Sequence, residues 1–248
     1  MRLYILAAAL GGLVIAAGAG AQASDPVLLK ELTWTEVRDA IRAGKTTIIV
    51  PAGGTEQNGP HMALGKHNAR VKVLSRDVAW MLGDALVAPV IAYVPEGGIT
   101  PPTAHMRYPG TITVPEEAFR KVLELAARSF KLHGFRNIVL LGDHGSTQAG
   151  QRAVAARLNR EWASTGVRVH AIEEYHRAAG IEVPRLLRAR GYSDAELGRH
   201  AGLTDTALML ALDARMVRAD RLRPGSPGDG VDGDPTRAPP SWAGRVPS

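Results

Sequence analysis

The chain has 248 residues, of which 45% are hydrophobic and 22% are charged, a composition typical of a globular protein with a sizeable core. Its formal net charge is +6, but the basic residues are scattered along the sequence and aromatic residues are few. Because nucleic acids are bound by clustered basic residues, we expect no nucleic-acid partner. The absence of cysteine excludes disulfides, a thiol nucleophile and lipid attachment through cysteine.

Residues 1–23 have the pattern of a secretory signal peptide. Arg2 supplies a short positive region, and residues 3–19 form an apolar run rich in small residues. Ala21-Gln22-Ala23 is a small-x-small cleavage site, so we predict cleavage after Ala23. The run is short for a membrane span, and an uncleaved anchor is the alternative. We therefore expect a periplasmic or secreted protein that is free of the membrane once the signal peptide is removed.

From residue 24 onward, helix and strand patterns alternate. A short helix is predicted to start at Thr35, as its N-cap, and to end at Gly44. Later helices are predicted, from apolar periodicity, at 68–82, 115–133, 149–162, 183–190, 194–197 and 204–212. Continuous apolar runs predict strands at 47–50, 85–94, 137–141 and 167–172. A loop rich in Gly and Pro over 95–109 has the length of a functional loop.

This alternation predicts an α/β fold, a single three-layer domain with a mostly parallel sheet and helices on both faces. In such sheets, ligands bind beyond the C-terminal ends of the strands. We expect the domain to cover residues 24–224. Periodicity is lost after Leu222, and residues 225–248 are predicted to be an irregular tail, which we interpret as a truncated or frame-altered terminus.

Three groups of polar residues contain side chains that could bind a metal ion or transfer a proton. Glu56 and His67 follow the strand at 47–50, and carboxylate and imidazole are ligands for Zn²⁺ or Mn²⁺. His144 follows the strand at 137–141, at the same expected edge of the sheet. His200 is a candidate proton carrier, because histidine titrates near neutrality. Each group also fits ordinary loop or helix-cap chemistry, so spacing alone leaves both interpretations open.

Five ordered segments resemble the motifs of the creatininase (creatinine amidohydrolase) family. They include Gly-Thr-Glu-Gln-Asn-Gly-Pro-His at 54–61, His-Met-Arg-Tyr-Pro-Gly-Thr-Ile at 105–112 and Gly-Asp-His-Gly at 142–145. The other two lie at 133–136 and 200–210, and the likeness runs from about residue 30 to about 222. The resemblance implies a metal-dependent hydrolase of a small amide or cyclic amide C–N bond, not a peptide bond.

The resemblance also implies roles for individual residues. The implied metal ligands are Glu56, His67 and His144, and the implied catalytic residues are His200 and Asp205, with Asp205 orienting His200. The implied substrate or outer-shell residues are Asn58, His61, His105, Tyr108 and Ser146. The family has a histidine, a metal-bridging aspartate and a glutamate where this chain has Asn58, His67 and Ser146. We therefore expect one ion of zinc or manganese, with a two-ion site as the alternative.

These departures leave a second hypothesis open, a non-catalytic ligand-binding relative that has lost the two-metal site. Other chemistry on the same scaffold is a third hypothesis, because a fold does not fix a reaction. A serine hydrolase using Ser146 is weaker, since this residue is not in a Gly-x-Ser-x-Gly elbow. The expected partner is a small-molecule amide substrate, and the resemblance implies a homo-oligomer.

Overall fold

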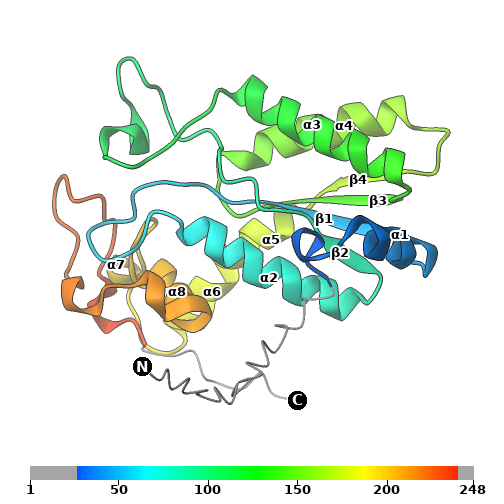
Figure 1. Ribbon diagram of the computed structural model, residues 1–248. Helices are drawn as coiled ribbons and strands as arrows, with labels where there is room; N and C mark the ends of the chain where they lie inside the picture. The colour runs from blue at the N-terminus through cyan, green and yellow to red at the C-terminus, as the bar shows by residue number, and fades with distance from the viewer. Residues whose placement is uncertain (1–26, 240–248) are drawn as a thin grey trace, which may run out of the picture.

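The computed structural model describes residues 27–239 (Figure 1). The predicted signal peptide at 1–23, its cleavage site after Ala23 and the end of the tail from residue 240 lie outside the described residues. Within the described part of the chain, no helix has the length and hydropathy needed to cross a membrane.

Four parallel strands form the centre of the fold. In spatial order they are β2 (Ala85–Val87), β1 (Thr47–Ala52), β3 (Asn137–Gly142) and β4 (Arg168–Ala171). Thr47 of β1 is in register with Ala85 on one side and Asn137 on the other. Every residue of β1 is buried, as is typical of a parallel strand covered on both faces.

Helices cover both faces of this sheet (Figure 1). One face packs against α3 (Glu116–His133) and α4 (Thr147–Glu161), with α1 (Trp34–Arg42) at its edge. The other face packs against α2 (Lys66–Leu82) and α5 (Glu173–Arg177). This arrangement confirms the predicted α/β architecture with helices on both faces.

The remaining helical elements follow β4 or connect the strands. Three helices, α6 (Val183–Arg188), α7 (Asp194–Leu197) and α8 (Leu203–Asp213), form a group in which α8 packs against α2. A π-helical turn covers Ala178–Glu182. Short 3-10 turns cover Leu29–Glu31, Ala104–Arg107, Ala214–Met216, Ala219–Arg221 and Pro235–Arg237.

Two local predictions were wrong. Thr33 caps α1, because its hydroxyl accepts the Glu36 N–H while the Glu36 carboxylate accepts the Thr33 N–H, so the capping box excludes Thr35 from that role. The strand predicted over 85–94 ends at Val87, and Pro89, which has no N–H, follows two residues later. The chain beyond Val87 therefore continues as a loop beside the C-terminal end of β1.

The C-terminal end of β1 passes very close to α2. A Cβ atom on Gly53 would lie 2.2 Å from Oδ1 of Asn68, so this position accepts no side chain without a shift of the loop. The same Oδ1 accepts a hydrogen bond of 3.0 Å from the Gly54 N–H. This hydrogen bond and the close approach at Gly53 fix the loop after β1 against the first turn of α2.

Glu124 links α3 to α4. Its carboxylate lies 2.7 Å from Arg157 and 2.9 Å from Arg128, and these two cations lower the pKa of Glu124 to about 2. A carboxyl group with a lowered pKa stabilises the fold above its ordinary pKa and loses that contribution as the pH falls through the folded-state value. We therefore expect Glu124→Gln to lower the Tm at pH 7, and the difference from the parent protein to vanish between about pH 4.5 and pH 2.

Thermal unfolding followed by circular dichroism between pH 7 and pH 2 checks this expectation. Both arginines are partly exposed, so solvent screening keeps the effect modest. Glu117→Gln, an exposed change on the same helix, serves as the control. A Tm difference for Glu124→Gln that does not change with pH contradicts the assigned ion pairs.

Candidate metal centre

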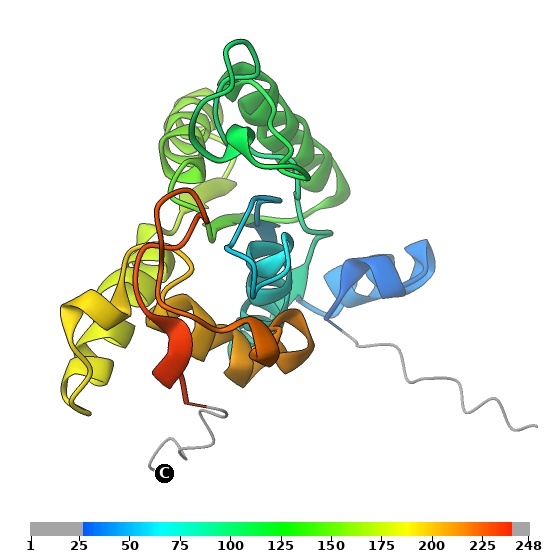
Figure 2. The same cartoon turned by 90° about the vertical axis from the view of Figure 1, so that its left-hand side faces the viewer.

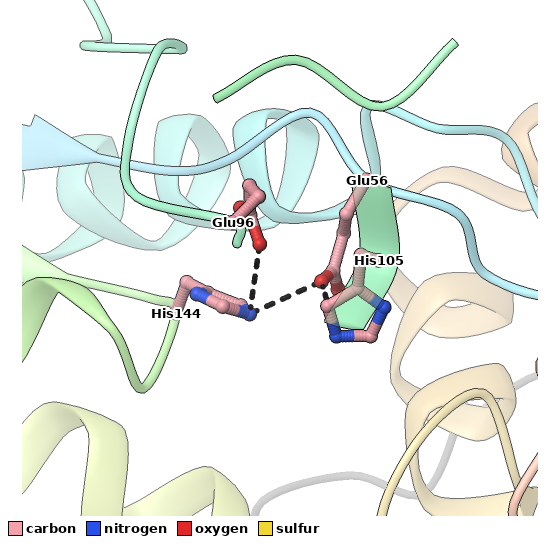
Figure 3. Close-up of side chains that lie close together, drawn as sticks. All are labelled: Glu56, Glu96, His105 and His144. Carbon is pink, nitrogen blue, oxygen red and sulfur yellow. Dashed lines mark ion pairs between the residues drawn. The ribbon is translucent and has the colours of Figure 1, made fainter. Parts of the chain in front are cut away.

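Four side chains converge at the C-terminal edge of the sheet (Figure 3). Glu56 follows β1, His144 follows β3, Glu96 lies in the loop beyond β2, and His105 lies in the 3-10 turn at Ala104–Arg107. Each of the four offers one ligand atom, and these atoms all lie within 4.8 Å of one another. Two carboxylates and two imidazoles form a donor set suited to Zn²⁺ or Mn²⁺.

Oε2 of Glu56 is the meeting point of this group. The Nε2 atoms of His105 and His144 each lie 3.1 Å from it, and Nε2 of His144 lies 3.5 Å from Oε2 of Glu96 (Figure 3). Glu56 and Glu96 are 0% and 3% exposed, yet neither Oε2 of Glu56 nor either carboxylate oxygen of Glu96 has a hydrogen-bond partner. Unsatisfied buried carboxylate oxygens are unfavourable, so their convergence on one point fits a divalent cation.

Electrostatics support the same interpretation. Burial and the charge of Glu56 raise the pKa of Glu96 to about 9, and a bound cation reverses such a shift. Burial lowers the pKa of His144 and of His105, which favours the neutral imidazoles that metals bind. Burial alone raises the pKa of Glu56, but the adjacent rings of His144 and His67 and the charge of Lys66 hold this pKa below its ordinary value.

Ser146 orients the ring of His144. Its Oγ lies 2.7 Å from Nδ1 of His144, at the start of α4. The backbone N–H of Ser146 also donates to this Nδ1, at 3.3 Å, so residue 146 holds the ring through both its side chain and its backbone. The structure thus places Ser146 beside a ligand, as an outer-shell residue, and the glutamate of the family pattern is absent from this position.

The prediction that His67 binds the metal is corrected by the structure. His67 lies in the first turn of α2, with Nε2 2.8 Å from Oε1 of Glu56 and Nδ1 2.5 Å from Oδ2 of Asp143. Its ring nitrogens are thus paired with two carboxylates, and His67 is not among the four side chains whose ligand atoms converge. The histidine instead fixes the orientation of Glu56.

The predicted pairing of Asp205 with His200 is also wrong. Asp205 bonds Lys66 at 2.7 Å and Arg70 at 2.9 Å, and it accepts the N–H of Ala201. His200 instead places Nε2 2.9 Å from the backbone oxygen of Gln57 and Nδ1 3.8 Å from Oε1 of Glu56. The two buried cations of α2 attract the aspartate more strongly than a neutral imidazole does.

Asn58 and His61 lie outside the ligand group. The Nδ2 of Asn58 donates to the backbone oxygen of Glu56 at 2.9 Å and to that of Ala63 at 3.2 Å, so Asn58 holds the loop in shape. His61 is fully buried, and its Nε2 lies 3.1 Å from Oγ1 of Thr206. This contact joins the loop after β1 to α8. Neither residue is placed to bind an ion at the centre.

Two cavities flank the centre. The first, of about 350 Å³, is lined by His144, Lys66 and Arg70 together with residues of α5–α8. The second, of about 560 Å³, is more open and is lined by Tyr108 and His105 on one side and by residues 225–233 on the other. His144 lines the first cavity and His105 the second, and His200 lines both, so each cavity reaches one histidine of the candidate ligand group.

The C-terminal tail forms part of the second cavity. Figure 2 shows it, in red, crossing the face onto which the loops after β1 and β3 open. Gln57 donates to the backbone oxygen of Gly230 at 3.1 Å, and a Cβ atom at Gly230 would lie 2.0 Å from Oε1 of Gln57. The irregular segment therefore packs tightly against the site in the described part of the chain.

Comparison with known proteins identifies the family. The family model for creatinine amidohydrolase matches residues 30–247 of the chain. The chain belongs to the creatininase family. The resemblance inferred from the sequence motifs is thereby confirmed, and the matched range includes most of the C-terminal tail.

Curated relatives of this creatininase-family chain are hydrolases by name. It is 26% identical over 225 residues to creatinine amidohydrolase from Pseudomonas putida, a match that covers 88% of this chain and 80% of the relative. It is 28% identical over 193 residues to the mycofactocin precursor peptide peptidase of Mycobacterium ulcerans (strain Agy99). That second match covers 73% of this chain and 64% of the peptidase, just under two thirds of its length.

Solved structures of creatininases share the fold. One described as "Creatininase Mn" has a TM-score of 0.64 and 26% identity over 86% of this chain and 85% of the other. A creatininase variant described as "Zn-Zn type" has a TM-score of 0.68 and 24% identity over 86% of this chain and 89% of the other. These likenesses confirm a creatininase-like fold.

Proposed function

We propose that this protein is a metal-dependent hydrolase that cleaves the C–N bond of a small amide or cyclic amide. The observation that carries the proposal is the convergence of Glu56, Glu96, His105 and His144 within 4.8 Å, with buried carboxylate oxygens that have no hydrogen bonds. Family membership supports it, because two matched relatives are named creatinine amidohydrolase and mycofactocin precursor peptide peptidase.

These four side chains would hold the ion, and we propose Zn²⁺ or Mn²⁺ because both are named for creatininases of this fold. An ion of either kind supplies Lewis acidity, which lowers the pKa of a water molecule and polarises the amide carbonyl. Ser146 and His67 hold His144 and Glu56 in place, through the 2.7 Å and 2.8 Å contacts described above. The protein thus brings a preorganised donor set to the reaction.

His200 is the proposed proton carrier. In the tautomer with the proton on Nε2, the ring donates to the backbone oxygen of Gln57 and keeps the lone pair of Nδ1 on the side of Glu56. Burial and the charge of Lys66 lower the pKa of His200 to about 4, so the ring is neutral at pH 7 and can accept a proton. The proton taken from the attacking water then passes to the leaving nitrogen of the substrate.

The cavity beside His144 supports a small polar substrate. Its volume of about 350 Å³ is at the lower end of the range for small-molecule sites, and charged side chains of both signs line it. We therefore propose a small amide or cyclic amide in preference to an extended peptide. Because one relative is named as a peptide peptidase, short peptides must be tested beside small amides as substrates.

We also propose that the protein acts in the periplasm or outside the cell, because residues 1–23 have the pattern of a signal peptide. Amino-terminal sequencing of the exported protein tests this proposal, with Ser24 expected as the first residue. Retention of residues 1–23 in a membrane fraction indicates an uncleaved anchor instead. A homo-oligomer stays a prediction that rests on the family resemblance.

The test of function is turnover by the purified protein loaded with Zn²⁺ or Mn²⁺. The substrate panel contains cyclic amides including creatinine, acyclic amides and short peptides, with release of the amine or ring-opened product as the measurement. We expect turnover of a small amide that falls at least about 100-fold in His144→Ala, since even outer-shell changes weaken metal sites about 10–100-fold. His170→Ala, an exposed histidine of β4, is the matched control.

Three outcomes separate the hypotheses. Turnover that is lost in His144→Ala and kept in His170→Ala supports the hydrolase. Tight binding of an amide without any turnover identifies a ligand-binding protein instead. Preference for peptides over every small amide retains the hydrolase but overturns the proposed substrate class.

A further inference from the structure

We propose that residues 225–234 of the C-terminal tail, here called the clasp, position the ring of His200. This role rests on the proposed function, because His200 is the proposed proton carrier of the same site. No helix or strand covers these described residues, and the sequence has no periodicity there. The clasp nevertheless reaches His200 by two routes, one through its backbone and one through the side chain of Gln57.

The first route is a pair of backbone hydrogen bonds. The N–H of Asp232 donates to the backbone oxygen of His200 at 2.8 Å, and the N–H of Arg199 donates to the backbone oxygen of Asp232 at 3.1 Å. These bonds form an isolated antiparallel bridge between His200 and Asp232. Further along the clasp, the N–H of Asp234 donates to the backbone oxygen of Glu196 at 2.9 Å. The clasp therefore holds the backbone from which the His200 side chain projects.

Glycines on both sides of this contact allow the close approach. A Cβ atom at Gly198 would lie 1.6 Å from the backbone oxygen of Asp232, and one at Gly233 would lie 2.8 Å from the backbone oxygen of Glu196. Both separations are shorter than van der Waals contact, so neither position accepts a side chain without a shift of the backbone. The clasp and the segment before His200 are thus fitted to each other.

The second route runs through the side chain of Gln57, which is 7% exposed. Its amide nitrogen lies 3.1 Å from the backbone oxygen of Gly230 and 3.0 Å from Nε2 of His200. The same nitrogen lies 3.2 Å from Nδ1 of His105. Because this buried side chain lies between the clasp and the imidazole, a displacement of Gly230 has to displace Gln57 and the ring beside it.

The two routes hold different parts of His200. Asp232 binds its backbone oxygen, whereas the backbone oxygen of Gln57 lies 2.9 Å from its Nε2. Nδ1 is then placed 3.8 Å from Oε1 of Glu56, on the side of the candidate metal centre. A misplacement of about 1 Å in a catalytic group can cost about 100-fold in rate. We therefore expect the position of the clasp to affect turnover even when the ion is bound.

Gly230→Ala and Gly228→Ala form a matched pair of variants within the clasp. Both glycines have positive φ, +79° and +85°, so alanine imposes similar backbone strain at either position. A Cβ atom at Gly230 would lie 2.0 Å from Oε1 of Gln57, whereas one at Gly228 would have no atom within 4 Å. Only Gly230→Ala therefore pushes against Gln57 and, through it, His200.

NMR of the imidazole nitrogens measures the position of the His200 ring in the metal-free protein. The His200 signals are assigned by their absence in His200→Ala. We expect these signals to shift in Gly230→Ala and to stay in place in Gly228→Ala. If Gly230→Ala does not fold, Gln57→Met, which removes the amide at nearly equal side-chain volume, is expected to shift the same signals. A folded variant of either kind whose His200 signals coincide with those of the parent overturns the inference.

Turnover by the Zn²⁺-loaded protein tests whether this positioning matters for catalysis. With the bound ion counted by elemental analysis, we expect kcat to fall at least about 10-fold further in Gly230→Ala than in Gly228→Ala. Adding Gly230→Ala to His200→Ala is expected to cause little further loss, because both changes act through the same ring.

Two results would contradict this catalytic role or the function itself. Losses that multiply in the double variant show that the clasp acts on turnover by another route, which overturns its role through His200. A parent protein without turnover of any amide rejects the proposed function instead. The NMR comparison then still decides whether the clasp positions His200.

Discussion

Glu56→Gln is expected to lose divalent-ion binding and hydrolysis together. Oε2 of Glu56 faces the candidate ion position, and Oε1 contacts His67 and Lys66. The neutral amide of glutamine lacks the negative charge that attracts the ion on one side and Lys66 on the other. We expect ion affinity to fall by at least about 100-fold, more than the loss from an outer-shell change. Turnover should fall by about 1000-fold or more, because a metal ion contributes several kcal/mol of transition-state stabilisation.

Isothermal titration with Zn²⁺ and an assay of amine release measure the two effects. Glu117→Gln makes the same chemical change at an exposed position of α3 and should leave both quantities unaltered. A Glu56→Gln protein that is folded and binds Zn²⁺ as tightly as its parent excludes Glu56 as a ligand.

Among the variants proposed here, Arg70→Met is expected to lose the most unfolding free energy. Arg70 is 4% exposed and bonds Asp143 and Asp205 at once. Its removal leaves the buried Asp143 with only His67 and Tyr175 as side-chain partners, and the partly buried Asp205 with only Lys66 as its cation. Breaking a buried ion pair from one side costs about 3–5 kcal/mol of unfolding free energy. For a chain of this length, each kcal/mol lowers the Tm by about 2–4 °C.

Chemical denaturation of the metal-free protein measures this loss without a contribution from bound ions. The control is Arg42→Met, because Arg42 is 74% exposed and only weakly paired with Asp39 at 3.9 Å, which predicts a loss of less than about 1 kcal/mol. Equal losses in the two variants would show that the ion pairs of Arg70 with Asp143 and Asp205 do not stabilise the fold.

Much of the fold could be predicted from the sequence because its central elements have strong local signals. β1 and β3 are continuous apolar runs that end in glycine-containing turns, and such runs specify buried parallel strands without any long-range information. α3 starts after Pro115 and ends at Gly134, which has φ of +104°. The predictions were wrong at two places. Thr33 and Thr35 both have the side chain of a helix N-cap, and the apolar run that predicted a strand over 85–94 is interrupted by Pro89.

The candidate site was harder to predict because its residues are far apart in the sequence and come together only in the folded protein. Glu56 and His144 became candidates because each follows a strand at the same sheet edge, and the family resemblance implied that they are metal ligands. Glu96 was missed, although an acid directly after the apolar run at 85–94 satisfies the same rule. His67 was assigned wrongly because its partner Asp143 lies 76 positions away, and no spacing pattern reveals that bond.

The tail over the second cavity has a consequence for how substrate preference and reactivity can change. The side chains that would hold the ion come from residues 56–144, whereas one wall of the open cavity is made of residues 225–233. These residues contact the site through Gln57 and through the backbone of His200, whose oxygen accepts the N–H of Asp232 at 2.8 Å. Exchange of this short glycine-rich stretch is therefore expected to change the wall of the cavity without altering any of the four candidate metal ligands.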